Sequence, residues 1–111
     1  MEIHEATEAF ASLSQETRLK VFKLLIEYGA DGLIPGKLAE ELAIPDNTLS
    51  FHLSHMARAG LVTSKRNGRS LTYFANTDLI ENLIDYLQDN CCERQSKSTT
   101  KRNKSSKGGK C

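Results

Sequence analysis

The chain has 111 residues and a formal net charge of +1, with 15 basic and 14 acidic side chains, which fits one domain with a modest core. No run of about 18 apolar residues is present, and the first residues are acidic, so a membrane-spanning helix and a secretory leader are not expected. These features predict a cytoplasmic protein without a membrane partner.

The first half of the chain is predicted to be helical. A short helix is expected over residues 5–10 and a longer one over 15–28, after the polar residues Ser12 and Ser14. The apolar set of the longer helix is Leu19, Phe22, Leu25 and Ile26. Pro35 suits the first turn of a helix over 36–42, whose core face would be Leu38, Ala39 and Leu42.

A further helix is predicted over 47–59, with Leu49, Leu53 and Met56 toward the core and Gly60 as its stop. Two β-prone runs follow, at 61–64 and 71–74, separated by a segment that contains the turn signal Asn67-Gly68. The segment between them would form a basic hairpin tip that carries Lys65, Arg66 and Arg69.

The last predicted helix spans residues 78–90, after a cap at Asn76 or Thr77. Its apolar stripe is Ile80, Leu83, Ile84 and Leu87. No later ordered element is expected to cover this stripe, which indicates a dimer. We therefore expect an ordered domain over 1–92, followed by a disordered basic tail over 93–111.

Charge is distributed unevenly between these two parts. The tail has seven basic residues against one acidic residue, about +6, which leaves about −5 for residues 1–92. Affinity for nucleic acid would therefore be a local property of one surface and not of the whole domain.

Two short helices joined by a tight turn and followed by a basic hairpin predict a mainly α fold with a β-hairpin wing, a winged helix-turn-helix. In such folds the second helix enters the major groove of double-stranded DNA. The face of the 47–59 helix opposite its apolar stripe is polar and contains no acid. Its candidate DNA-binding residues are Asn47, Ser50, Phe51, Ser54, His55 and Arg58.

Phe51 is the most informative of these residues, because an exposed aromatic side chain opposite the core indicates a binding role. Contact with a thymine methyl group is one such role. Lys65, Arg66 and Arg69 are candidates for phosphate contacts, although turns are often basic merely for solubility. His52 lies nearer the core, where a packed histidine and a phosphate contact are equally acceptable interpretations.

Three cysteines, Cys91, Cys92 and Cys111, are confined to the C-terminal end, which fits free thiols in a reducing compartment. Cys91 would extend the apolar stripe of the last helix, and Cys92 would point about 100° away from it. Neighbouring thiolates suit a soft metal or metalloid. Cys111 is either a third ligand or an incidental terminal thiol.

Several motifs together resemble the ArsR/SmtB family of metal-responsive transcriptional repressors. They are Leu-Ser-Gln-Glu-Thr-Arg-Leu at 13–19, Leu-Ala-Glu-Glu-Leu at 38–42, Ser-Phe-His-Leu at 50–53 and Ala-Gly-Leu-Val at 59–62. The resemblance implies a homodimer paired through its first and last helices. It also implies an apo-repressor that binds an operator without a cofactor and is released by a metal or metalloid inducer.

The chain departs from two sites known in that family. Ile34 and Gly36 stand where the resemblance implies a Cys-x-Cys arsenic site, and the last helix contains no histidine for a zinc site. Cys91 and Cys92 instead resemble family members that bind trivalent arsenic at the C-terminal end of the last helix. The expected inducer is therefore As(III) or a similar thiophilic ion.

Two alternatives remain open at this point. One is a repressor that senses thiol oxidation without a metal, and the other is a plain nucleic-acid-binding module whose tail supplies the affinity. An enzyme is not expected, because no cluster of residues suggests a nucleophile with its base.

Overall fold

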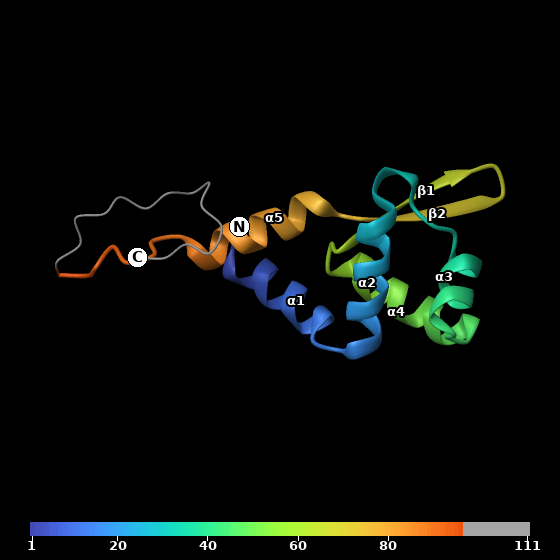
Figure 1. Ribbon diagram of the computed structural model, residues 1–111, viewed down its shortest axis with the longest axis horizontal. Coiled ribbons are helices and arrows are strands. Elements are labelled where there is room, and N and C mark those ends of the chain that lie inside the picture. The colour runs from blue at the N-terminus through green and yellow to red at the C-terminus, as the bar shows by residue number, and fades with distance from the viewer. Residues whose placement is uncertain (97–111) are drawn as a thin grey trace.

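The fold contains five α-helices, one short 3-10 helix and a two-stranded hairpin in the computed structural model, which describes residues 1–96. The elements in chain order are α1 (Ile3–Leu13), α2 (Glu16–Tyr28), η1 (Gly29–Asp31), α3 (Pro35–Leu42), α4 (Asp46–Arg58), β1 (Val62–Asn67), β2 (Ser70–Ala75) and α5 (Thr77–Gln88). This arrangement confirms the predicted winged helix-turn-helix (Figure 1). No helix within the described part is both long enough and apolar enough to cross a membrane.

The helices α2, α3 and α4 pack around one apolar core, which also includes residues from α1, β1 and α5. Leu49, Leu53 and Met56 of α4 are buried, as their spacing predicts. The prediction for α2 was partly wrong. Phe22 and Leu25 are buried together with Val21, whereas Leu19 and Ile26 are exposed. The face of α2 that contacts the core is narrower than the apolar spacing suggests.

The helix α1 is longer than the predicted 5–10, since it begins at Ile3 and ends at Leu13. The Glu5 carboxylate accepts a hydrogen bond from the Glu2 backbone N–H at 3.0 Å, which satisfies one of the donors that a helix start leaves unpaired. Ala6 and Ala9 face the core. Small side chains on this face allow α1 to lie close against its neighbours.

The hairpin is longer and its turn tighter than predicted. Its ladder runs from Val62↔Ala75 to Asn67↔Ser70, so only Gly68 and Arg69 form the loop. Gly68 has a φ of +65°, a conformation that glycine adopts without steric cost. Lys65 and Arg66 therefore lie on β1 and not at the tip, while Arg69 lies in the turn.

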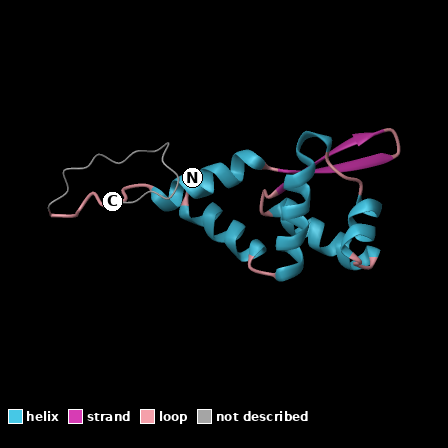
Figure 2. Cartoon of the chain, in the orientation of Figure 1, coloured by secondary structure: helices cyan, strands magenta, loops and turns pink. Residues whose placement is uncertain are grey.

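A backbone bridge in the middle of β2 ties the hairpin to the segment before α3. Leu33 exchanges two backbone hydrogen bonds with Tyr73, at 2.9 and 2.8 Å. Figure 2 shows how the paired strands extend beyond the helices. This bridge fixes the direction of the hairpin relative to α2 and α3.

The helix α5 ends at Gln88, two residues earlier than predicted. Asp89 is extended with ψ 139°, and Asn90 has a φ of +62°, so neither residue continues the helix. The prediction that Cys91 extends the stripe of α5 was therefore wrong. Leu83 is buried, but Ile84 and Leu87 are 52% and 62% exposed.

Gly32, next to Leu33, gives a test of the hairpin attachment. It has a φ of +64°, and an added Cβ would lie 2.6 Å from the Phe74 ring and 2.7 Å from Thr72. Gly32→Ala should lower the free energy of unfolding by about 2–3 kcal/mol, because it combines left-handed strain with overpacking. Urea denaturation followed by circular dichroism measures the change.

Gly36→Ala is the matched control. Gly36 lies within α3 with open space around its Cα, so alanine should stabilise the protein by about 0.5–1 kcal/mol. Equal stability of the two variants would contradict a tightly packed junction at Gly32.

Candidate nucleic-acid interface

The outward face of α4 is polar with one aromatic residue at its centre. Asn47, Ser50, Phe51 and Ser54 are all exposed, and Phe51 is 63% exposed. The turn of residues 43–45 joins α4 to α3, and Ala43 adopts a left-handed φ of 54° that closes α3. The burial of the apolar stripe of α4 leaves these four side chains free to meet a ligand surface.

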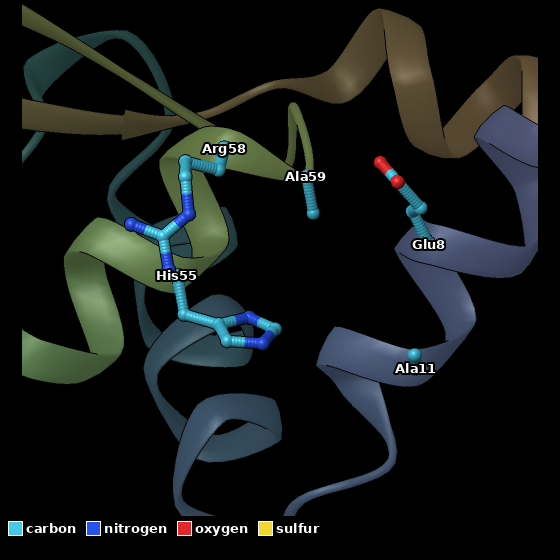
Figure 3. Close-up of a pocket in the computed structure, with 5 residues that line it drawn as sticks. All are labelled: Glu8, Ala11, His55, Arg58 and Ala59. Atoms are coloured by element: carbon cyan, nitrogen blue, oxygen red, sulfur yellow. The ribbon is translucent and has the colours of Figure 1, made fainter.

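The structure places His55 and Arg58 apart from the other four predicted α4 residues. They line an open cleft of about 500 Å³ between α4 and α1, together with Glu8, Ala11 and Ala59 (Figure 3). His55 is only partly exposed, and its Nδ1 lies 3.1 Å from the Ser12 hydroxyl. Arg58 is exposed at the last turn of α4.

His52 is 8% exposed and is held by Arg18 of α2, whose Nη1 lies 3.2 Å from the His52 Nδ1. A guanidinium has no acceptor, so this Nδ1 must accept, which places the imidazole proton on Nε2. Burial, followed by the nearby charges of Arg18 and His55, lowers the pKa of His52 below its usual value. His52 is therefore a packed histidine, the first of its two predicted interpretations.

Sequence reasoning overlooked the two residues that contact these histidines, Ser12 and Arg18. Ser12 is fully buried, although it was expected to precede a helix as a polar cap. Gln15 fills that role instead, because its side chain accepts from the Arg18 backbone N–H at 2.9 Å. The available signal was the motif at 13–19, which contains Arg18 and begins directly after Ser12.

The hairpin extends the outward surface beyond α4. The strand β1 packs against α4, and Lys65, Arg66 and Arg69 are all exposed. Lys65 and Arg66 are neighbours on β1, so their side chains project to opposite faces of the ribbon. Three exposed cations thus lie on one hairpin whose first strand packs against α4.

The cysteines lie beyond α5, in consecutive turns. The Sγ atoms of Cys91 and Cys92 are 3.2 Å apart, and Cys92 has a φ of +65°. A two-thiolate site requires both cysteines in the reduced form, because the thiolate is the metal ligand. Cys111 and most of the basic tail lie outside the described residues, and their predicted roles stay predictions.

The described residues contain no group of three or more His, Cys, Asp or Glu side chains that could hold a metal ion. Within residues 1–96 the predicted site therefore offers two sulfur ligands, those of Cys91 and Cys92. Sulfur–metal bonds of about 2.3 Å allow two sulfurs at this separation to reach one ion. The pair fits a thiophilic ion but not a hard cation, which prefers oxygen ligands.

Comparison with known proteins also identifies a helix-turn-helix domain. A family described as a helix-turn-helix domain matches residues 13–65. An uncharacterised helix-turn-helix transcriptional regulator of Methanocaldococcus jannaschii is 32% identical over 90 residues, which covers 80% of this chain and 99% of that protein. These similarities are to regulators, which confirms that the chain is not an enzyme.

Solved structures extend the likeness to the wing and the outer helices. An ArsR-like transcriptional regulator from Rhodococcus sp. RHA1 superposes with a TM-score of 0.72 at 27% identity, covering 82% of this chain and 83% of that one. A homodimeric winged helix-turn-helix domain from Mycobacterium bovis shares the fold, with a TM-score of 0.65 at 19% identity over 86% of this chain and 89% of its own. The chain therefore belongs to the helix-turn-helix transcriptional regulators, and its structure is similar to that of an ArsR-like regulator.

Proposed function

We propose that the protein is a homodimeric repressor that binds operator DNA through α4 and the hairpin, and that a thiophilic ion at the C-terminal cysteines releases it. The observation that carries the DNA-binding part is the outward polar face of α4 with Phe51 exposed at its centre, beside a basic arm. Trivalent arsenic is the inducer that the resemblance favours.

Chemistry assigns different tasks to the two DNA-binding parts. Asn47, Ser50 and Ser54 offer short polar groups suited to base edges in the major groove, and Phe51 offers an apolar surface for a thymine methyl. Lys65, Arg66 and Arg69 offer charge without a fixed geometry, which suits phosphates. The helix would therefore carry sequence preference, and the hairpin would carry general affinity.

A homodimer is supported by apolar side chains left exposed on α1 and α5. Ile3 is 70% exposed, and Ile84 and Leu87 of α5 are also more than half exposed. These helices lie toward the same end of the molecule, away from α3 and the hairpin (Figure 1). Pairing two copies through this end would bury these side chains and place two α4 helices at a fixed separation.

The cysteines support the inducer site through their position. Cys91 and Cys92 follow α5 directly, so an ion that draws their sulfurs together acts at the end of the proposed dimer helix. A change in how the two α5 helices pair would alter the separation of the two α4 helices. Coupling of this kind typically amounts to about 1–3 kcal/mol, or about 5- to 150-fold in DNA affinity.

The division of tasks between helix and hairpin can be tested with two variants on fluorescent operator DNA. Phe51→Ala should reduce discrimination between operator and unrelated DNA by about 1–3 kcal/mol, with little loss of stability because the side chain is exposed. Lys65→Gln/Arg66→Gln should weaken binding to both DNAs and lower the slope of log K against log salt by about two. Fluorescence anisotropy across salt concentrations measures both effects.

Lys20→Gln is the control for loss of a cation elsewhere on the surface, because Lys20 is exposed on α2 and pairs with Glu16 at 3.4 Å. It should leave the salt slope unchanged. If Phe51→Ala and the double variant both bind as the wild type does, α4 and the hairpin are not the interface. Loss of all binding on deletion of residues 93–111, with weak sequence preference, would instead favour the plain nucleic-acid-binding module.

The inducer is tested by titrating arsenite into the reduced protein bound to operator DNA. Wild-type protein should be released with a 5- to 150-fold loss of affinity, whereas Cys91→Ser/Cys92→Ser should stay bound. Cys111→Ser, in a separate variant, decides whether a third thiolate contributes. Anisotropy reports release in each case.

The same assay separates ion sensing from redox sensing. Unchanged binding of reduced wild-type protein in arsenite would contradict the arsenic proposal. If an oxidant then releases the DNA and a thiol reductant restores binding, the cysteines act as a redox sensor without a metal. The observation that supports this second candidate is the short distance of 3.2 Å between the Cys91 and Cys92 sulfurs.

A further inference from the structure

We infer that Ser12 and Arg18 are positioning residues that set operator affinity by holding α4 from the α1–α2 junction, without touching DNA themselves. The inference rests on the proposed role of α4 as the DNA-reading helix. It concerns two residues that the interface described above does not include.

Arg18 forms the first link between the junction and α4. Its Nε donates to the Ser12 backbone carbonyl at 2.8 Å, and its Nη1 donates to the His52 Nδ1 at 3.2 Å. A guanidinium is planar and its donors point in fixed directions. Arg18 therefore sets the distance and the orientation between the end of α1 and the middle of α4, which an apolar contact would not do.

Ser12 forms the second link. Its hydroxyl lies 3.1 Å from the His55 Nδ1, while its backbone carbonyl accepts from Arg18. Ser12 is fully buried, so its hydroxyl has no water to exchange for the histidine. His52 and His55 are three residues apart, which places them on adjacent turns of α4.

Two such links restrict how α4 can rotate and slide on the core. The effect reaches the DNA-reading face directly, because the Phe51 and His52 rings are in edge contact, with centroids 5.6 Å apart. A rotation of α4 that displaces His52 from Arg18 would therefore carry Phe51 with it. Misplacement of a recognition helix by even a fraction of an ångström weakens the hydrogen bonds it makes to base edges.

The Arg18 link depends on the protonation of His52. A protonated His52 has no lone pair on Nδ1 and cannot accept from Arg18, so the bond would become a contact between two cations. Arg18 from α2 and His55 on α4 are the charged and titratable groups that act on His52, and both disfavour its protonated form. Ser12, the α1 residue in the network, is neutral. Acidification should therefore release α4 from Arg18.

The sign of this effect distinguishes positioning from simple charge attraction. An extra positive charge near DNA strengthens binding as pH falls, because DNA phosphates are negative. Loss of the Arg18–His52 link predicts the opposite, weaker operator binding as the pH falls below about 6.5, the ordinary pKa of histidine, because the pKa of His52 is lowered from that value. The two explanations cannot give the same pH profile.

The test measures operator binding of Arg18→Gln and Ser12→Ala by fluorescence anisotropy at pH 7.5, with circular dichroism to confirm that each variant is folded. Arg18→Gln should bind about tenfold more weakly, the order expected for losing a hydrogen bond to a charged group. Ser12→Ala should weaken binding severalfold while leaving Arg18 in place. Lys20→Gln, which removes a cation from the same helix, should bind as the wild type does.

Two further readouts separate positioning from direct contact and from general destabilisation. The salt slope of Arg18→Gln should equal that of the wild type, since a lost phosphate contact would lower it by about one. His52→Gln keeps an acceptor oxygen for Arg18 and should bind normally at pH 7.5, with a flatter pH profile. His52→Leu should bind as weakly as Arg18→Gln at every pH.

The inference is overturned if Arg18→Gln binds normally, if its salt slope falls by one, or if wild-type binding strengthens on acidification. Those results would leave the proposed interface intact provided that Phe51→Ala still loses discrimination. If Phe51→Ala binds normally while Arg18→Gln does not, the proposed DNA-reading face is wrong instead.

Discussion

The arrangement of the domain depends on burial of one stripe of α4. Leu49, Leu53 and Met56 are almost fully buried against α2, α3 and β1, and their removal from water is the main favourable contribution to packing. The same burial decides which residues face outward. Phe51 is exposed because it lies on the side of α4 opposite the buried stripe. Burial of the stripe therefore creates both the core and the candidate interface.

Apolar packing of this kind holds α4 in place but tolerates small rotations and shifts. The hydrogen bonds from Ser12 and Arg18 to the two histidines add direction, because each bond weakens steeply when its angle changes. A regulator that reads base edges needs that added precision in its recognition helix. The buried polar network therefore lies at the boundary between α1, α2 and α4, where apolar contacts alone would not define the geometry.

The elements proposed to bind DNA and those proposed to pair the dimer lie at two ends of the molecule that share this central core. The hairpin and α3 extend at one end, and α1 and α5 lie at the other (Figure 1). Ser12 is close to the end of α1, so the helix proposed for dimer pairing also contacts α4 through His55. A change in the packing of α1 would therefore act on α4 through the Ser12–His55 contact.

The sequence by itself determined the order of the elements, the buried stripe of α4 and the basic hairpin, because hydrophobic spacing and turn residues are local signals. Only the tertiary structure decided that α5 ends at Gln88, that Lys65 and Arg66 lie on a strand, and that Leu19 is exposed. It also turned His55 toward α1 and buried Ser12, contacts between residues 43 positions apart that no local pattern encodes. Periodicity reports which face of an element is apolar, but the partners of its polar residues depend on which elements meet in space.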